Sequence, residues 1–420
     1  MSGAPPKQQR LDAAFLRGAS VRRVFSALAG SGAQTRIVGG AVRNALLGEE
    51  VHEIDFVTTL PPQETAARAA AAQIRSVPTG IEHGTVTLVI DGAPFEVTSA
   101  REDVETDGRR AKVKFGADFA KDAMRRDFTI NALSVDADGV LYDPVGGLAD
   151  IAARRVRFIG DARLRIAEDY LRILRFFRFH SAFASGPMDA DAIHAIIAER
   201  GGLKGLSSER IRAELIKLIM TRNAAEVCAQ MCDAGLLAPL MAGIAYPARL
   251  ARVIAIEAAR EAAPQAMLRW MALTIATPED ARRLHIRLRM SNAETLRSEK
   301  AAAALAGLHA RTKPPAYGAL REILFECGRM AATDAITLAQ ASSGAAPNDA
   351  EWRSAWLFLR DTPKPQLPFS GADLLARGLT GGREMGRILK TLQASWIRAG
   401  FPKDPASIAR LLDEAAQRSE

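Results

Sequence analysis

The chain is poor in cysteine and histidine and contains no long apolar run. Its three cysteines, Cys228, Cys232 and Cys327, form neither an even disulfide framework nor a zinc spacing with the six histidines. We therefore expect a protein of a reducing compartment, the cytoplasm. The histidines also lack the His-Asp pairing of a phosphohydrolase, which argues against an added phosphatase domain.

Signals for a membrane or for secretion are not found in the sequence. No run of 18 apolar residues occurs, so we expect no membrane span, and residues 1–10 lack the apolar core of a signal peptide. The composition is globular, 48% hydrophobic and 25% charged over 420 residues, enough for about two to four domains. The net charge of +8 favours an anionic partner such as nucleic acid, although many mildly basic proteins have none.

The pattern changes character near residue 145. Before it, apolar and β-branched runs predict strands over residues 37–38, 54–58, 85–90 and 95–98. Residues 64–75 are rich in alanine and predict a helix. From about residue 150 onward, strand signals nearly vanish and Leu, Ala, Ile and Arg recur at helical spacing. The chain is thus expected to have a mixed α/β part followed by an all-α array.

A glycine pair joins the first strand to a helix-like run. Gly39 and Gly40 let the backbone approach a ligand closely, and the helix that follows offers unpaired N–H groups and the positive end of its dipole. Arg43, one turn into that helix, can reach the same anion. Taken alone, this pattern fits either a phosphate cradle or a tight turn with a solvated arginine.

Two carboxylates alternate on the next apolar segment. Glu53 and Asp55 are expected to point the same way from a strand, with Ile54 and Phe56 turned to the core. Such a pair can bridge divalent cations, and magnesium suits a site of few carboxylates plus substrate phosphates. The alternative is two surface acids on an edge strand. Glu96, on a neighbouring strand, fits either a third acid near the metals or a solvent-facing residue.

Residues 125–132, Arg-Arg-Asp-Phe-Thr-Ile-Asn-Ala, form a more specific motif. Arg125 and Arg126 can set guanidinium groups against a triphosphate, while Asp127 and Asn131 fix the ribose or neighbouring backbone. A capped helix with surface charges explains parts of this string but not the whole.

A second specific motif spans residues 168–179. On a helix, Asp169 and Arg172 are i,i+3 neighbours, and Arg175 and Arg178 continue the row. A carboxylate beside a guanidinium offers acceptors and donors that can complement the Watson–Crick edge of adenine or cytosine. The alternative is an ordinary surface Asp–Arg pair, worth a few tenths of a kcal/mol.

Two further segments carry charge with less specificity. Residues 101–121 are poor in apolar residues and include Arg109, Arg110, Lys112 and Lys114, so we predict a mobile loop, either solvated or in contact with substrate. Residues 206–212 predict the start of a helix that Ser208 caps, a structural role.

Five features follow one another along the chain: Gly39-Gly40, Glu53-x-Asp55, residues 125–132, residues 142–147 (Tyr-Asp-Pro-Val-Gly-Gly) and residues 168–179. Together they resemble the class II tRNA nucleotidyltransferase and bacterial poly(A) polymerase family, within the DNA polymerase β-like nucleotidyltransferases. The resemblance covers about residues 36–215, with a weaker match over residues 370–389. It implies an α+β fold, with a polymerase β-like mixed head followed by an all-α neck, body and tail in a seahorse-like layout. The implied parts are an N-terminal tail and first helix, a nucleotidyltransferase head, a neck with the base-reading motif, and a tRNA-binding body and tail: residues 1–21, 22–145, 146–225 and 226–420.

The resemblance further implies template-independent addition of C, C and A to the 3′ end of tRNA. The substrates are CTP, ATP and the tRNA acceptor arm, pyrophosphate is released, and Mg2+ assists by two-metal phosphoryl transfer. The implied metal ligands and catalytic acids are Glu53 and Asp55. The implied nucleotide contacts are Gly39, Gly40, Arg43, Arg125, Arg126, Asp127 and Asn131. Asp169 and Arg172 are implied to read the base, supported by Arg175 and Arg178.

Glu53 departs from the family pattern, which has Asp at this position. Glutamate is one methylene longer, and magnesium demands near-ideal octahedral geometry. Either the backbone accommodates the longer side chain or the first metal is held less well; we expect an active enzyme. The alternatives are a poly(A) polymerase, an enzyme that adds A only or CC only, and a catalytically impaired RNA-binding protein. The chain lacks the extra basic segment associated with bacterial poly(A) polymerases, which favours CCA addition.

Overall fold

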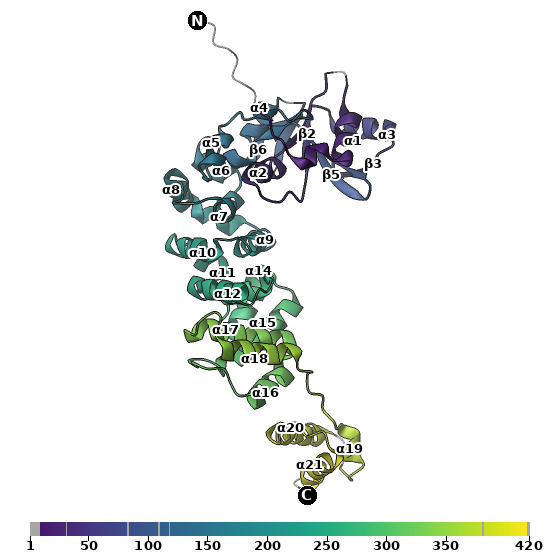
Figure 1. The fold of residues 1–420 in the computed structure, drawn as a ribbon, viewed down its shortest axis with the longest axis vertical. Helices are drawn as coiled ribbons and strands as arrows, with labels where there is room; N and C mark the ends of the chain where they lie inside the picture. Colours follow the sequence, from purple (N-terminus) through teal and green to yellow (C-terminus); the bar gives the residue numbers. More distant parts are fainter. Residues whose placement is uncertain are drawn as a thin grey trace. The chain divides into compact units, whose positions relative to one another are not determined.

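The computed structural model describes residues 9–30, 32–81, 84–107, 110–116, 118–379 and 382–417 (Figure 1). By its internal contacts the chain divides into two compact units, Met1–Val227 and Cys228–Glu420. Within the described ranges, no helix is long and apolar enough to cross a membrane.

A seven-stranded sheet forms the centre of the first unit, in the order β3-β4-β5-β2-β1-β8-β9. Its strands are β1 (Thr35–Val38), β2 (Asp55–Thr58), β3 (Arg75–Gly80), β4 (Thr85–Ile90), β5 (Ala93–Ser99), β8 (Ser134–Val135) and β9 (Leu141–Tyr142). Neighbouring strands are antiparallel except β2 and β5, which run parallel. The four predicted strands are confirmed as β1, β2, β4 and β5, whereas β3, β8 and β9 were not predicted.

The two faces of the sheet have different neighbours. On one face, Phe56 packs edge-on against Phe25 of α1 (Ala19–Leu28), with ring centroids 5.3 Å apart. The helix α3 (Pro62–Ala71) packs beside α1 on the same side and ends four residues before the predicted limit, because Gln73 turns with a φ of 55° and β3 follows. The opposite face carries a small cluster of Val38, Val57, Ala100 and Phe119. Since alternate residues of a strand point to opposite sides, Asp55 shares this second face with Val57.

The segment predicted to be a mobile loop is mostly a β-hairpin, so that prediction was wrong. β6 (Arg101–Asp107) and β7 (Arg110–Phe115) pair antiparallel in a separate two-stranded sheet. The register places Glu102 opposite Lys114 and Glu105 opposite Lys112. Arg109 lies outside the described residues. Low hydrophobicity suggested a loop, whereas the backbone of this segment pairs as two strands.

The helices of the first unit surround the sheet and continue the chain beyond it (Figure 1). Around the sheet they are η1 (Ala14–Arg17), α2 (Gly40–Leu47), α4 (Phe119–Met124), η3 (Thr129–Asn131) and α5 (Gly147–Ala152). Beyond it they are α6 (Ala162–Glu168), α7 (Leu171–Phe183), α8 (Ala190–Glu199), η4 (Arg200–Gly205), α9 (Ser208–Ile219) and α10 (Ala224–Asp233), which crosses into the second unit. In α7, Leu171, Leu174 and Phe177 follow one another at intervals of three residues and are buried. α7 packs against α9, and on another side its residues Phe176 and Phe179 pack against Phe128.

The second unit is helical throughout its described residues, as predicted. Its helices are α11 (Leu237–Met241), α12 (Pro247–Ala259), α13 (Ala266–Thr274), α14 (Pro278–Leu288), α15 (Asn292–Ala306), α16 (Tyr317–Cys327), α17 (Arg329–Ser343), α18 (Ala350–Asp361), α19 (Gly371–Leu375), α20 (Arg383–Arg398) and α21 (Pro405–Gln417). The long helix α17 packs against α12, α15 and α18. The last three helices enclose a core of their own around Trp396 and Phe401, whose rings lie 4.9 Å apart.

Candidate active site

The glycine pair forms a sharp turn between β1 and α2. Gly39 has a φ of +67°, a conformation that favours glycine, and α2 begins at Gly40. A Cβ on Gly39 would lie 3.3 Å from Nη1 of Arg126 and 3.7 Å from the carbonyl oxygen of Asn131. The Gly39 amide donates to the carbonyl of Leu133 at 3.2 Å. The turn is therefore glycine both for its backbone conformation and because residues 126–133 pack directly on it.

Three carboxylates, Glu53, Asp55 and Glu96, gather near the start of β2; we call them the acidic edge. Asp55 is the first residue of β2, and Glu53 lies just before the strand, so only one of the predicted pair is on it. Because Phe56 pairs with Val97 in the parallel register, the preceding Asp55 and Glu96 are neighbours. The surrounding protein and the Glu96 and Glu53 carboxylates raise the pKa of Asp55, and Arg126 opposes them. Glu96, which the sequence left undecided, thus faces the same site.

The acidic edge has the donor chemistry that a hard cation requires. All three groups are carboxylates, and burial together with repulsion from Glu96 and Glu53 raises the pKa of Asp55. Among the described residues, no three His, Cys, Asp or Glu side chains converge closely enough to hold a metal by themselves. Magnesium sites commonly combine one or two carboxylates with water and substrate phosphates. The residues therefore fit a cation that is completed by the substrate.

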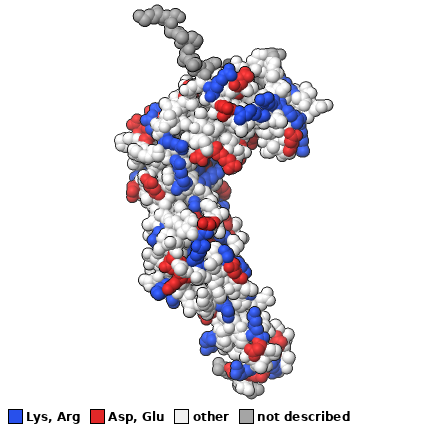
Figure 2. Space-filling model, in the orientation of Figure 1, with Lys and Arg blue, Asp and Glu red and all other residues white. Residues whose placement is uncertain are grey.

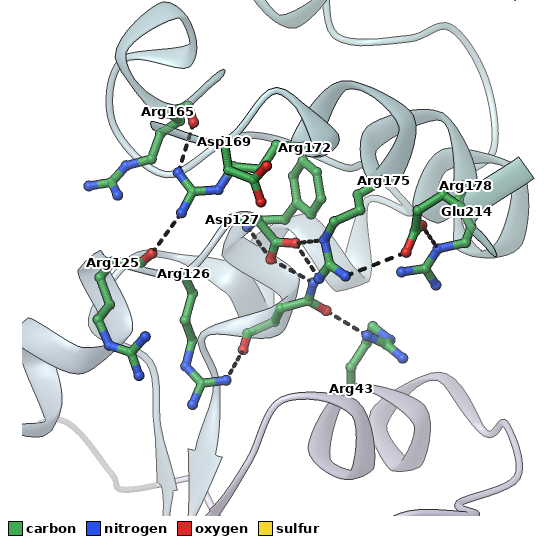
Figure 3. A network of polar contacts seen from close by, with 12 residues as sticks. Arg43, Arg125, Arg126, Asp127, Arg165, Asp169, Arg172, Arg175, Arg178 and Glu214 are labelled. Carbon is green, nitrogen blue, oxygen red and sulfur yellow. Dashed lines mark hydrogen bonds and ion pairs between the residues drawn. The ribbon is translucent and has the colours of Figure 1, made fainter. Parts of the chain in front are cut away.

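A continuous set of polar contacts joins α2 to α7 and α9 (Figure 3). We call it the arginine network; its members are Arg43, Asp127, Asn131, Arg175, Arg178 and Glu214. Arg43 Nη1 donates to Asn131 Oδ1 at 2.5 Å, and Asn131 Nδ2 donates to Asp127 Oδ1 at 3.0 Å. Arg175 Nε donates to Asp127 Oδ2 at 2.7 Å, so the chain of contacts passes from α2 through residues 127–131 to α7.

The far end of the network is anchored on α9. Glu214 is buried and accepts from Arg178 Nε at 2.6 Å, while Nη1 of Arg175 lies 3.9 Å from its other oxygen. Burial alone would raise the pKa of Asp127, but Arg175 and the hydrogen bonds from Asn131 and Phe128 outweigh it, so that pKa is lowered. The network therefore favours the ionised form of Asp127 and holds its guanidinium groups in fixed positions.

Aromatic rings support the same arginines. Arg43 lies over the ring of Phe183 at 4.3 Å, and Arg178 lies over Phe179 at 4.2 Å. Burial and the nearby Arg178 lower the pKa of Arg43 to about 10. Arg43 remains a cation at neutral pH. Stacked, partly desolvated guanidinium groups of this kind suit recognition of a polyphosphate.

Arg125 and Arg126 are both held by one residue that the sequence did not single out, Asp122. Its Oδ1 accepts from Arg125 Nε and Nη2 at 2.9 and 2.6 Å, and its Oδ2 from Arg126 Nη2 at 3.2 Å. Burial opposes ionisation of Asp122, but Arg126 and Arg125 more than offset it and lower its pKa. Arg126 also donates to the carbonyl of Asn131, which points its side chain toward the glycine turn and Asp55.

Asp169 and Arg172 do not pair with each other as the helical spacing predicted. Asp169 lies between α6 and α7 in extended backbone, where its carboxylate accepts from the Leu171 amide at 3.1 Å and from Arg210 Nη2 at 2.7 Å. Arg172 instead donates to Glu168. It also donates to the carbonyls of Arg165 and Arg125 (Figure 3). The break between the two helices is the reason, because i,i+3 spacing brings side chains together only on one continuous helix.

Four charged residues of this site were not predicted as site residues from the sequence: Asp122, Glu168, Arg210 and Glu214. Arg210 and Glu214 are four apart on α9, in the segment interpreted as structural, and Ser207 rather than Ser208 caps that helix. The available signal was Glu214, a charged residue at an inward position of an amphipathic helix, since buried charges are rarely left without a partner.

The first unit combines a mixed sheet, a glycine turn, a strand that begins with a carboxylate, and several arginines on the adjacent helices. This combination defines it as the catalytic part of a nucleotidyltransferase. Residues 35–157 match the model of the poly A polymerase head domain, and residues 187–246 match that of a probable RNA- and SrmB-binding site of polymerase A. The chain is 32% identical over 380 residues to mitochondrial CCA tRNA nucleotidyltransferase 1 of Mus musculus, covering 88% of this chain and 84% of that protein. It is 30% identical to the CCA-adding enzyme of Levilactobacillus brevis over 93% and 97% of the two chains. The chain belongs to the CCA tRNA nucleotidyltransferase family.

Solved structures agree with this assignment. The CCA-adding enzyme of Bacillus stearothermophilus in complex with CTP aligns with a TM-score of 0.72 and 26% identity, covering 94% of this chain and 96% of that one. The Thermotoga maritima enzyme complexed with tRNA, at 20% identity and a TM-score of 0.66, shares the fold. The α+β fold with a polymerase β-like head followed by helices is thereby confirmed, as is the family that the motifs resembled.

Proposed function

We propose that this enzyme adds C, C and A to the 3′ end of tRNA, from CTP and ATP and without a nucleic-acid template. The proposal rests on the arginine network, because one set of contacts joins α2, which follows the glycine turn, to α7. In this proposal the glycine turn and α2 bind the triphosphate, and the start of α7 lies beside the base. The 3′ hydroxyl of the tRNA attacks the α-phosphate, a new P–O bond forms, and the bond to the β-phosphate breaks to release pyrophosphate.

Each part of the site has a separate task in this proposal. Gly39, Gly40 and Arg43 receive the triphosphate, and Arg125 and Arg126 neutralise charge that moves onto the leaving pyrophosphate. Asp127 and Asn131 hold the arginines and the ribose in place, and Arg175 and Arg178 support them. Asp169 and Arg172 present an acceptor and a donor to the base.

The acidic edge would hold Mg2+, with Asp55 and Glu53 as ligands and Glu96 close by. When bound, the metal lowers the pKa of the attacking hydroxyl and neutralises charge on the phosphates. Its ligands must be ionised, and the raised pKa of Asp55 makes that ionisation sensitive to acid. Mg2+ binding should therefore weaken on acidification, because protons and the cation compete for Asp55.

The helical remainder, residues 226–420, would hold the tRNA. On the face drawn in Figure 2, basic and acidic side chains are interspersed. The whole chain has a net charge of +8. We expect contact mainly with phosphates of the acceptor arm, and an affinity for tRNA that falls steeply with salt.

The division of the chain into parts that begin at residues 22, 146 and 226 also belongs to this proposal. The three cysteines are free thiols, which supports a reducing cytoplasm as the compartment.

The test is incubation of the purified protein with tRNA that lacks its 3′ CCA, Mg2+ and labelled CTP or ATP. Ordered addition of C, C and A is the expected result. Unlimited A addition would instead identify a poly(A) polymerase, and tight tRNA binding without incorporation would identify an impaired RNA-binding protein. An affinity for tRNA that is equal at low and high salt would contradict the phosphate-dominated contact.

A further inference from the structure

The residue that follows Asp169 lies against a glycine. Gly202 belongs to η4, and a Cβ built on it would lie 2.0, 2.2 and 2.3 Å from Cε1, Cδ1 and Cζ of Tyr170. Carbon atoms that are not bonded do not approach so closely, so the ring of Tyr170 occupies the space that a side chain at position 202 needs. Gly202 has no positive φ, and its backbone would therefore accept any L-residue. The ring, not the backbone, is the reason for glycine here.

Tyr170 stands where the chain turns into α7. Asp169 is extended, with a φ of −156°, whereas Tyr170, the N-cap of α7, is already helical, with φ −61° and ψ −16°. The Asp169 carboxylate reaches forward to the Leu171 amide, across Tyr170. A displacement of the Tyr170 ring that pulls on its backbone is therefore transmitted to the carboxylate of Asp169.

One segment supports this corner from two sides. Gly202 contacts the Tyr170 ring, and Arg210, eight residues further along, holds Oδ2 of Asp169 at 2.7 Å. The two residues are joined by the end of η4 and the Ser207 cap of α9. Asp169 is thus fixed by its own helix, by Arg210, and through Tyr170 by Gly202.

We propose that Gly202 is a positioning residue for nucleotide selection. By admitting the ring of Tyr170, it sets the place of Asp169 relative to Arg172, and the choice between CTP and ATP depends on that placement. The inference rests on the proposed function, in which Asp169 and Arg172 read the base.

The adjacent residue provides a matched control. A Cβ on Gly201 would meet nothing within 4 Å, and its φ is not positive either. We compare Gly202→Ala with Gly201→Ala, measuring kcat/KM for CTP on tRNA that lacks CCA and for ATP on tRNA that ends in CC. Gly202→Ala should lower kcat/KM by about 10- to 100-fold and change the CTP-to-ATP ratio. Gly201→Ala should stay within about twofold of the parent protein for both.

A second pair of variants separates positioning from a general loss of structure. In a Tyr170→Ala background the obstructing ring is gone, so adding Gly202→Ala should cost less than about twofold further. Tyr170→Ala alone should itself change the CTP-to-ATP ratio, a readout that remains available where Gly202→Ala alone fails to fold. An unchanged ratio in both Gly202→Ala and Tyr170→Ala, or an equal cost of Gly202→Ala with and without the ring, would overturn the proposal.

The outcome can be distinguished from failure of the proposed function. If the parent protein incorporates neither nucleotide, the proposed function fails. The affinities of the same variants for CTP and ATP, measured by calorimetry without RNA, then still report on the base-reading corner. If the parent adds C, C and A while Gly202→Ala and Gly201→Ala have the same kcat/KM and CTP-to-ATP ratio, the proposed function is supported and the positioning role of Gly202 is contradicted.

Discussion

The arginine network and the acidic edge lie in the same site but carry their charge in opposite ways. In the network each acid is already matched with guanidinium groups, and the pKa of Asp127 is lowered. At the acidic edge three carboxylates face one another, with Arg126 as a nearby cation, and the pKa of Asp55 is raised. The arginine network is complete before any ligand binds, whereas the acidic edge has a negative charge that a cation must balance.

This difference separates the expected effects on stability from those on activity. Removing a member of a completed buried network leaves a partner unpaired and should destabilise the fold. Removing a carboxylate from a group of mutually repelling ones relieves repulsion, so it should cost activity without cost to stability. The following four substitutions test the comparison.

Asp55→Asn should have the largest effect, a loss of nucleotide addition of at least about 10³-fold, because the metal loses an ionised ligand. The fold raises the pKa of Asp55, so the ionised form that prevails at pH 7 is disfavoured by the native state. The variant's melting temperature should therefore match or exceed that of the parent by about 1–3 °C. Mg2+ should raise the melting temperature of the parent and not of the variant. Unchanged addition by Asp55→Asn would remove Asp55 from the metal site.

Asp127→Asn should break the network and reduce the free energy of unfolding at pH 7 by about 2–3 kcal/mol, measured in urea. This loss of unfolding free energy is smaller than the loss expected when a fully buried ion pair is broken, because Arg175 is one-third exposed. The folded pKa of Asp127 is lowered, so its stabilisation is present above the unfolded value near pH 3.9 and is lost as pH falls through the folded one. The difference between parent and variant should shrink below about pH 4. Asp138→Asn, at an exposed position in the same unit, is the control. An equal loss for both variants would contradict a completed network.

Arg43→Lys keeps the charge but loses the hydrogen bond from Nη1 to Asn131, the forked contact of Nε and Nη2 with Asn44 Oδ1, and the stacking on Phe183. We expect KM to rise about tenfold for CTP and ATP alike, because the triphosphate is common to both. Arg22→Lys, exposed on α1, should change neither value. A change for one nucleotide only would indicate that Arg43 contacts the base.

Glu53→Asp should have the smallest effect, less than about threefold in kcat/KM. Glu53 is exposed and precedes β2, so the backbone there is free to place the longer side chain. A gain in rate of 100-fold or more would mean that glutamate impairs the enzyme. That result would sharpen the view of the acidic edge as the incomplete part of the site.

Local patterns predicted the parts of the molecule that local physics decides. Apolar and β-branched runs predicted β1, β2, β4 and β5, and helical spacing predicted the helices that follow residue 150. The hairpin of β6 and β7 was missed, because its stability comes from pairing between strands that individually look like a solvated loop. The predicted end of α3 was wrong for a related reason, because the residues from Arg75 onward form β3 and pair with β4.

The sequence by itself determined which chemistry is present: a glycine turn, acids beside a strand, and arginines at threefold spacing on a helix. Such features depend on residues close together in the chain. Only the tertiary structure decided the pairings: Asp169 with Arg210 rather than Arg172, Glu96 beside Asp55, and Gly202 beneath Tyr170. These contacts join residues 32 to 41 positions apart. Such distances carry no periodic signal, because packing of whole elements, not local spacing, brings the side chains together.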